Sequence, residues 1–264
     1  MKIIKTAALT KARMRDLAGL EAACQTEGSA PVRFPLEDAD SVFLLYETDA
    51  GDRLAAALFL IMPQIPDSNE PAECIAYTHP ALRRKGYFSR LFEAAKAEIE
   101  ETDLFFPVSQ NSEGALKALE ALGADFSHAE YRMELSLAGR AASFDSAGQS
   151  PLPQGRDCAG PLLCTVTEEA DDVRSYSFSL GNGEDAVCHT IRYQTSACLY
   201  GLSVRPGLRN QGLGSRCLLR VLTSLAQEGA RLVFLHVSGD NLPAVSLYKK
   251  TGFRVTETLS YYLY

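Results

Sequence analysis

Several features that would place this chain in a common class of protein are missing from its sequence. No stretch reaches the roughly 18 consecutive apolar residues that a membrane-spanning helix needs. The first 20 residues hold no unbroken apolar core of the kind found in secretory signal peptides. The net charge is −7 and the isoelectric point is near 5.2, so the chain lacks the positive charge typical of nucleic-acid-binding proteins. We therefore expect neither a membrane nor a nucleic acid as partner.

Cysteines arranged as metal or disulfide motifs are also missing. The seven cysteines are an odd number and lie scattered without a CxxC pair. This pattern favours reduced, mostly buried thiols in a cytoplasmic protein, and we expect no metal. The hydrophobic fraction of 46% is ordinary for a globular protein, and 264 residues suffice for two domains of modest size.

A change of composition divides the chain. Residues 138–161 are rich in Gly, Ser, Ala and Pro without periodic apolar positions, so we predict a linker between a first domain, 1–137, and a second domain, 162–264. Both domains repeat one order of features: a strand, a proline, a basic turn with glycine, a helix, a short apolar strand, an asparagine, a second helix, and a glycine before a final strand. This order runs through 74–78, 83–86, 87–101, 104–108, 111, 115–122 and 123, and again through 199–204, 209–214, 215–228, 232–237, 241, 244–250 and 252. Such self-similarity predicts a duplicated domain.

The segments before the repeated parts differ between the domains. The first domain has a predicted strand at 3–8, a helix at 9–24 and a hairpin formed by 42–47 and 54–61 around the turn 49–52. The second has predicted strands at 163–167, 176–180 and 186–193, with a turn at 181–183. Since no amphipathic helix precedes its basic turn, we expect the second domain to lack the opening helices.

The basic turn of the second domain carries the most specific chemistry. A strand over 199–204 runs through Pro206 into the segment RNQGLG, which leads into a helix. The unpaired N–H groups at a helix start and the positive end of the helix dipole suit an anionic pyrophosphate. Gly212 and Gly214 let the backbone approach phosphates closely, and Arg209 adds a positive charge that can bond a phosphate oxygen. The turn also lacks the GxGxxG pattern of dinucleotide-binding proteins.

The segment downstream makes the assignment specific. A strand FLHV is followed by NxxAxxLYxxxGF, which contains Asn241, Tyr248 and Gly252. Together with the turn, this arrangement resembles the GCN5-related N-acetyltransferase (GNAT) superfamily, closely over residues 199–264 and more loosely in the first domain. The resemblance implies an α/β (α+β) fold of two tandem GNAT-like domains, each a mixed, mostly antiparallel sheet flanked by helices. It also implies acetyl-CoA as co-substrate.

The resemblance implies a role for each matching residue. The fourth strand would splay from the fifth, and Leu202, Ser203 and Val204 would bond the pantetheine arm in the gap. Asn241 would also bond this arm, and Tyr248 would lie beside the thioester sulfur. The pyrophosphate would be held by N–H groups of Asn210, Gln211, Gly212, Leu213, Gly214 and Ser215.

For catalysis we expect Tyr248 as general acid and the Val204 N–H as donor to the oxyanion. His236 stands where the ribosomal-protein alanine acetyltransferases of this family carry a glutamate, and an imidazole suits the work of a general base. A structural role for His236 and a water relay stay open, with Asp240 and Tyr200 as other candidates for the base.

The first domain keeps only part of the motif. Phe88 stands where the second domain has Gly214, and Leu119 stands where it has Tyr248. A leucine cannot protonate a thiolate, so we predict a degenerate first domain that packs on the second, with CoA binding there left open.

The sequence thus predicts an acetyl-CoA-dependent N-acetyltransferase acting on a small-molecule or peptide amine, as a monomer or homodimer. The alternatives are a non-catalytic acyl-CoA-binding sensor or interaction protein, and an enzyme for O-acylation or longer acyl chains. No motif identifies the acceptor, although the acidic composition favours a cation.

Overall fold

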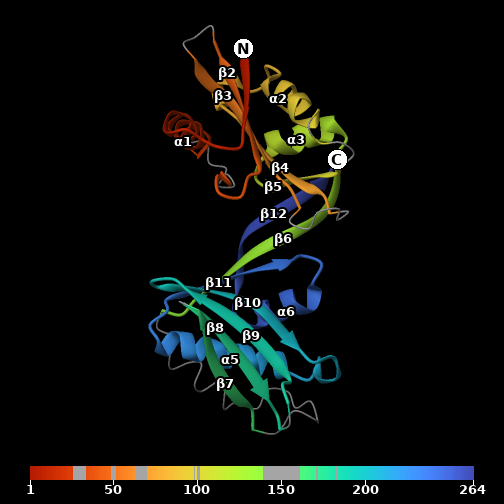
Figure 1. Ribbon diagram of the computed structural model, residues 1–264. Coiled ribbons are helices and arrows are strands. Elements are labelled where there is room, and N and C mark those ends of the chain that lie inside the picture. The colour runs from red at the N-terminus through yellow and green to blue at the C-terminus, as the bar shows by residue number, and fades with distance from the viewer. Residues whose placement is uncertain are drawn as a thin grey trace. The chain divides into compact units, whose positions relative to one another are not determined.

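A computed structural model describes residues 1–25, 34–48, 52–63, 70–97, 99, 102–138, 161–170, 172–181 and 183–264 (Figure 1). Nearly all of the predicted linker 138–161 lies outside these residues, as do 49–51 and 182 of the two predicted turns. The chain forms two compact units. Unit 1 comprises Met1–Ala129 and Thr258–Tyr264, and unit 2 comprises Glu130–Glu257. Within the described part of the chain, no helix is long and apolar enough to cross a membrane.

Unit 1 is built on a mixed sheet with the strand order β1-β2-β3-β4-β5-β12. Neighbouring strands are antiparallel except β4 and β5, which run parallel. The strands span β1 Lys2–Thr6, β2 Ser41–Glu47, β3 Arg53–Ile61, β4 Ala72–Thr78, β5 Leu104–Ser109 and the end of β12 Arg254–Leu263.

Helices cover both faces of this sheet. Helix α1 (Lys11–Gln25) packs its buried side chains on one face, while α2 (Tyr87–Lys96) and α3 (Glu113–Leu122) pack on the other. The predicted helix 87–101 ends early, at Lys96. Three glutamates follow at 98, 100 and 101, and negative charge at a helix C-terminus opposes the helix dipole.

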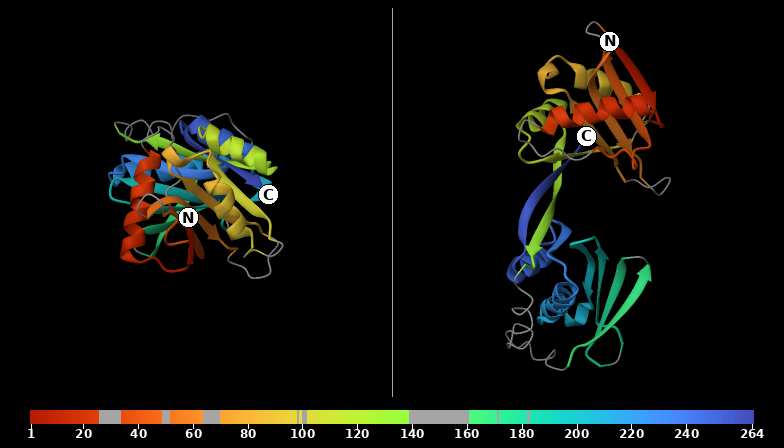
Figure 2. Two further views of the ribbon diagram at one scale, coloured as in Figure 1. Left: turned by 90° about the horizontal axis from the view of Figure 1, so that it is seen from above. Right: turned by 90° about the vertical axis from the view of Figure 1, so that its left-hand side faces the viewer.

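Unit 2 is built on the remaining strands, in the order β6-β11-β10-β9-β8-β7, of which β10 and β11 are the parallel pair. Its strands span β6 Asp125–Ser136, β7 Leu163–Ala170, β8 Val173–Ser179, β9 Ala186–Arg192, β10 Ser196–Val204 and β11 Leu232–Ser238. Helices α5 (Leu213–Gln227) and α6 (Leu242–Thr251) pack their apolar sides into one core with the sheet. The right-hand view of Figure 2 shows α5 on one side of these strands.

The other face of the unit 2 sheet carries no helix among the described residues. In the described part of 161–212 no α-helix precedes α5, in agreement with the prediction that opening helices are lacking. Alternate residues of the strands therefore face either the helix-covered core or this helix-free face. The predicted fold class, two mixed and mostly antiparallel α/β units in tandem, is confirmed.

The two units exchange their last strands along the chain. β6 follows the helices of the first half in sequence, yet Glu130–Ser136 pair with Leu232–Ser238 of β11. The C-terminal end of β12 pairs with β5 in unit 1, from Leu259 opposite Ser109 to Leu263 opposite Phe105. The compact units therefore differ from the contiguous segments 1–137 and 162–264. Strand pairing is a non-local choice that composition and turn signals do not reveal.

Candidate functional site

The predicted phosphate-binding turn has an unusual backbone. After β10, the short helix η2 (Pro206–Leu208) leads to Arg209 in an extended conformation and to Asn210 with φ of 62°. Gly212, with φ of 83°, is the N-cap of α5 and supplies no side-chain cap. Gly and Asn adopt this left-handed backbone conformation more easily than other residues do. The N–H groups of the first turn of α5 therefore receive no side-chain cap from Gly212, and a helix N-terminus is a general site for anions.

Unit 1 reproduces this turn. The short helix η1 (Pro80–Leu82) leads to Arg83 in an extended conformation, Arg84 with φ of 64°, and Gly86 with φ of 78° as the N-cap of α2. Arginine in this conformation is uncommon and strained. The same backbone at both places supports the predicted duplication.

The first arginine after the short helix of each turn binds the end of the preceding strand. Arg209 donates from Nε to the Val204 carbonyl oxygen at 2.9 Å, and Arg83 donates from Nε to the Thr78 carbonyl oxygen at 3.3 Å. Arg209 therefore holds the turn against the end of β10.

A gap opens between β10 and β11. The two strands pair only from Ser196–Leu232 to Cys198–Phe234, although both continue beyond that point. Tyr200 and His236, each two residues past the last pair, stand on opposite sides of this gap and are exposed. The predicted splay is therefore present. It also occurs in unit 1, where β4 and β5 pair only at Ala72–Leu104 and Glu73–Phe105.

A β-bulge marks the gap side of β10. The register with β9 shifts between Tyr200 and Ser203, so Gly201 and Leu202 together oppose one residue of β9. Gly201 has φ of 62°, and a Cβ there would lie 2.9 Å from His189 Cδ2, so both conformation and space require glycine. β4 of unit 1 pairs with β3 without such a shift. We did not anticipate this bulge, although a glycine inside a strand pattern is the signal for one.

The bulge and the ladder together determine where β10 directs its main-chain groups. Arg205 N–H donates to the Asp185 carbonyl oxygen at 2.9 Å. Hydrogen-bonded and non-hydrogen-bonded pairs alternate in an antiparallel ladder, so Val204, opposite Ala186, points its N–H and C=O away from β9. These groups consequently face the open side of the strand.

Tyr248 lies on α6 with 7% of its surface exposed, within the core between α6 and the sheet. Burial raises the pKa of its hydroxyl to about 12. Its ring packs edge-on against Phe253 at 5.7 Å. In unit 1 the equivalent Leu119 is 3% exposed and belongs to the apolar core.

His236 lies on the other side of the sheet from Tyr248. Its neighbours Leu235 and Val237 face the core that contains Tyr248, so His236 faces the helix-free side, where its ring meets Phe234 at 6.1 Å. Asn241 caps α6, because its Oδ1 accepts the Ala244 N–H at 3.2 Å. Asp240 is exposed beside it.

Gly214 faces the inside of the site. A Cβ at this position would lie 3.4 Å from Leu247 Cδ2 on α6 and 3.6 Å from Val204 Cγ2 at the end of β10. In unit 1 this position holds Phe88, whose ring stacks on Phe92 with centroids 5.7 Å apart. A large side chain therefore fills in unit 1 the position that glycine leaves open in unit 2.

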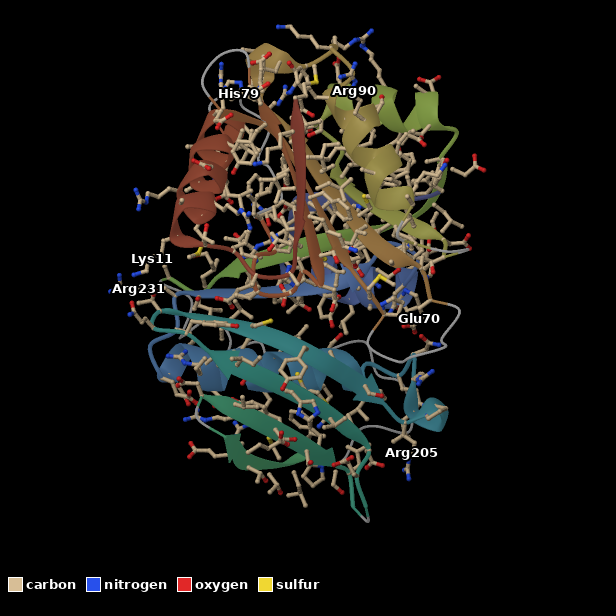
Figure 3. All side chains as sticks on the ribbon, turned by 45° about the horizontal axis from the view of Figure 1, so that its top comes forward. Lys11, Glu70, His79, Arg90, Arg205 and Arg231 are labelled. Atoms are coloured by element: carbon tan, nitrogen blue, oxygen red, sulfur yellow. The ribbon has the colours of Figure 1, made fainter. Side chains whose placement is uncertain are left out.

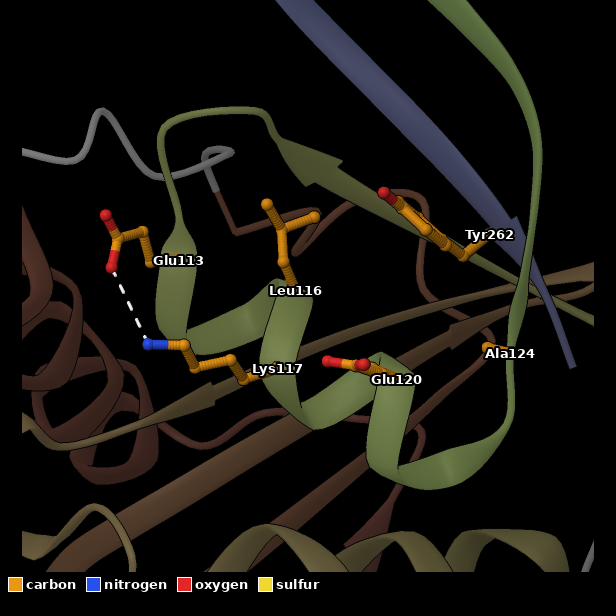
Figure 4. A pocket seen from close by; sticks show the side chains of 6 residues that line it. All are labelled: Glu113, Leu116, Lys117, Glu120, Ala124 and Tyr262. Atoms are coloured by element: carbon orange, nitrogen blue, oxygen red, sulfur yellow. Dashed lines mark ion pairs between the residues drawn. The ribbon is translucent and has the colours of Figure 1, made fainter.

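One sizeable hollow lies elsewhere. About 410 Å³ of open space lies against α3 in unit 1, bordered by Leu116, Tyr262 and an ion pair of 3.7 Å between Lys117 and Glu113 (Figure 4). It lies on exposed helix side chains, and none of the predicted site residues borders it. We therefore place the candidate site at the turn and gap of unit 2.

Comparison with known proteins points to the same part of the chain. Residues 185–253 match the acetyltransferase (GNAT) family. A solved structure described as a tandem GNAT protein from the clavulanic acid biosynthesis pathway superposes with a TM-score of 0.67 at 17% sequence identity, covering 100% of this chain and 98% of that one. The residues matched by the family contain the turn, the gap, α5 and α6. The solved structure has the same tandem fold over the whole chain.

Two curated relatives bear one name. A mycothiol acetyltransferase of Clavibacter michiganensis is 26% identical over 254 residues, which cover 83% of this chain and 78% of the relative. A mycothiol acetyltransferase of Saccharomonospora viridis is 42% identical over 60 residues, but these span only 23% of this chain and 20% of that protein. The chain is thus similar to a curated acetyltransferase over most of its length, and the sequence identity to another is higher over a short segment.

Proposed function

We propose that this chain, which belongs to the GNAT acetyltransferases through its second half, transfers an acetyl group from acetyl-CoA to a primary amine at the gap of unit 2. The observation that carries the proposal is the end of pairing after Cys198–Phe234, beside a turn of left-handed residues that starts a helix. An extended arm can add to a strand edge by main-chain hydrogen bonds, and a pyrophosphate suits a helix N-terminus. Acetyl-CoA combines both chemical features in one molecule.

Main-chain groups supply most of the proposed acetyl-CoA contacts. On β10 we assign them to Leu202 in the bulge and to Val204, since the ladder turns the main-chain groups of Ser203 toward β9. The N–H groups of residues 210–215 are assigned to the pyrophosphate. Asn241 uses Oδ1 as the cap of α6, so its amide Nδ2 is the group assigned to the pantetheine arm.

The proposed reaction is direct attack by a neutral amine. Its nitrogen forms a bond to the thioester carbonyl carbon, the carbonyl oxygen becomes an oxyanion, and the C–S bond then breaks. The amine nitrogen loses a proton to a base, and the sulfur leaves as a thiolate that needs a hydrogen-bond donor. We assign the oxyanion to the Val204 N–H, because that group faces away from β9.

Tyr248 is assigned as the acid beside the departing sulfur. With its pKa raised to about 12 by burial, the hydroxyl stays protonated throughout the neutral range. A thiol has an ordinary pKa of about 8.5, so full transfer of the phenol proton to the thiolate is uphill. We therefore expect Tyr248 to act mainly by donating a hydrogen bond to the developing thiolate.

His236 is assigned as the base. It faces the helix-free side of the sheet while Tyr248 lies on the helix side, so the two side chains lie on opposite sides of the sheet. Direct attack needs the base on the side from which the amine arrives and the donor at the leaving sulfur. Tyr200, across the gap from His236, is the alternative base within reach of the same face; Asp240 or a relayed water is the next.

We propose a supporting role for unit 1. It keeps the turn and the splay, but Leu119 replaces the acid, Phe88 occupies the position of Gly214, and β4 lacks the bulge. Each difference removes a group or a space that the proposed reaction uses.

The proposed acceptor is a small-molecule amine. The curated relatives are named mycothiol acetyltransferases, so an amine precursor of that type belongs in an acceptor panel beside polyamines, aminoglycosides and peptide N-termini.

Release of free CoA from acetyl-CoA with this panel is the deciding measurement. Turnover with one amine and not with its N-acetylated form supports the proposal. Tight binding of acetyl-CoA with no turnover for any amine would favour a non-catalytic sensor. Turnover with an alcohol, or with a longer acyl chain only, would favour another acyltransferase.

A further inference from the structure

We infer that Asp185 is a positioning residue for the acyl-CoA turn of unit 2; this inference rests on the proposed function. Asp185 lies directly before β9 with 3% of its surface exposed, and it was not among the predicted site residues. A buried aspartate costs free energy unless its oxygens are paired. Its partners are therefore informative.

Asp185 binds the first residue of the turn by two separate contacts. Its main-chain oxygen accepts the Arg205 N–H at 2.9 Å, and its carboxylate Oδ1 pairs with Arg205 Nη2 at 2.5 Å. Arg205 is the N-cap of η2, so its backbone sets where the turn leaves β10. Figure 3 labels Arg205 at this place.

The second carboxylate oxygen of Asp185 connects the start of the turn to the end of β8. Oδ2 accepts the Leu180 N–H at 2.7 Å just after β8, and the Asp185 N–H donates to the Phe178 carbonyl oxygen at 2.8 Å. Asp185 thus joins the ends of β8 and β10. On the other side of β10, Arg209 holds the Val204 carbonyl oxygen, so the start of the turn is fixed from both edges of the strand.

Unit 1 has the turn without this carboxylate. His79 stands where Arg205 stands, and its N–H donates to the Ala55 carbonyl oxygen at 2.8 Å, which is the same main-chain bond. Alanine supplies no partner for a side chain, and the His79 ring instead contacts Arg53. The Asp185–Arg205 pair is therefore added to the turn of the unit that we propose as catalytic.

Positioning has a specific kinetic consequence. The Arg205 side chain is 55% exposed although Asp185 is buried, and the pair lies at the start of the turn that we propose presents N–H groups to a pyrophosphate. Loss of the pair should let the turn shift, weakening acetyl-CoA binding while Tyr248 and His236 stay in place. The effect should appear in the KM for acetyl-CoA rather than in kcat.

The test compares Asp185→Asn, Arg205→Gln and the double variant in the full chain. The amide introduced by Asp185→Asn would keep an oxygen for the Leu180 N–H while the charge is lost. We expect acetyl-CoA affinity by titration calorimetry to fall about tenfold in each single variant, which corresponds to about 1.4 kcal/mol for the lost ion pair. The double variant should lose no more than either single one, because both act through one pair.

Glu228→Gln is the matched control. It removes a carboxylate that pairs with Arg174 at the far end of α5, outside the turn. The control should lower thermal stability without changing acetyl-CoA affinity. If Asp185→Asn behaves like the control, or if the two single effects add, the positioning role is wrong. If the wild-type chain binds neither acetyl-CoA nor CoA, the proposed function itself fails. Should Asp185→Asn not fold, Arg205→Gln alone decides, with unchanged affinity overturning the inference.

Discussion

Tyr248 and Leu119 occupy equivalent positions in the two units. Each lies four residues before a left-handed glycine that ends its helix, Gly252 with φ of 103° and Gly123 with φ of 78°, and each is buried. The duplicated backbone thus places a phenol in one unit and an alkyl group in the other. This difference is one reason why we propose the gap of unit 2, and not that of unit 1, as the place of acetyl transfer.

Replacing Tyr248 by phenylalanine should lower kcat by about 10- to 100-fold, within the usual range for a positioned proton donor. The ring and its packing on Phe253 remain, so the Kd for acetyl-CoA should stay within about twofold of wild type by titration calorimetry. Tyr176→Phe is the control, because it also removes a phenol hydroxyl from the core of unit 2. Unchanged kcat in the Tyr248 variant would remove the acid from the mechanism.

The raised pKa of Tyr248 also predicts how stability depends on pH. Burial disfavours the phenolate in the folded protein. The contribution of the neutral Tyr248 hydroxyl to the free energy of unfolding is therefore fully present below the unfolded pKa near 10, and it is lost as pH rises toward about 12. Between pH 9 and 11, the unfolding free energy of wild type should fall by about 1 kcal/mol more than that of Tyr248→Phe. Urea denaturation at both pH values measures this, and parallel losses would contradict the burial of the hydroxyl.

Gly214→Glu should abolish acetyl-CoA binding. Its side chain would start between Leu247 and Val204 and bring a negative charge to the proposed pyrophosphate site. Gly214→Ala adds only a Cβ at ordinary contact distance and should bind with less than about a tenfold loss. Gly181→Glu, which adds the same charge in open space, is the control. A thermal shift with acetyl-CoA equal to that of wild type in Gly214→Glu would place the ligand elsewhere.

His236→Gln should lower turnover by about 10- to 100-fold at neutral pH, and the loss should shrink as pH rises and more of the amine becomes neutral by itself. The pH dependence of kcat/KM with a fixed amine measures this. His128→Gln, which lies in unit 1, is the matched control. A loss that is equal at every pH would assign His236 a structural role and leave Tyr200 or a water relay as the route for the proton.

A fragment of residues 162–264 should not fold as a cooperative unit. It lacks β6, whose residues Glu130–Ser136 pair with β11 and whose Met133 and Leu135 are buried in the core of unit 2. Removing one such side chain usually costs about 2–5 kcal/mol, a large part of a domain's stability. A fragment of residues 130–264 keeps β6 and should unfold cooperatively in circular dichroism. Acetyl-CoA binding by the shorter fragment would contradict the strand exchange.

Local features were readable from the residues. The alternating apolar positions, the prolines after β4 and β10, and the basic glycine turns predicted the order of strands and helices and the duplicated turn, because backbone conformation there depends on each residue and its near neighbours. The NxxAxxLYxxxGF motif placed Tyr248 four residues before a helix-ending glycine for the same reason.

Tertiary structure alone decided the rest. The exchange of β6 and β12, the side of the sheet that His236 faces and the pairing of buried Asp185 with Arg205 all join residues far apart or on different strands. An isolated strand carries two edges that can pair with many partners, so its neighbours are selected by the packing of the whole core. The sequence determined the local conformation of the turn. The folded sheet determined which residues hold the turn in place and that it lies beside the gap between β10 and β11.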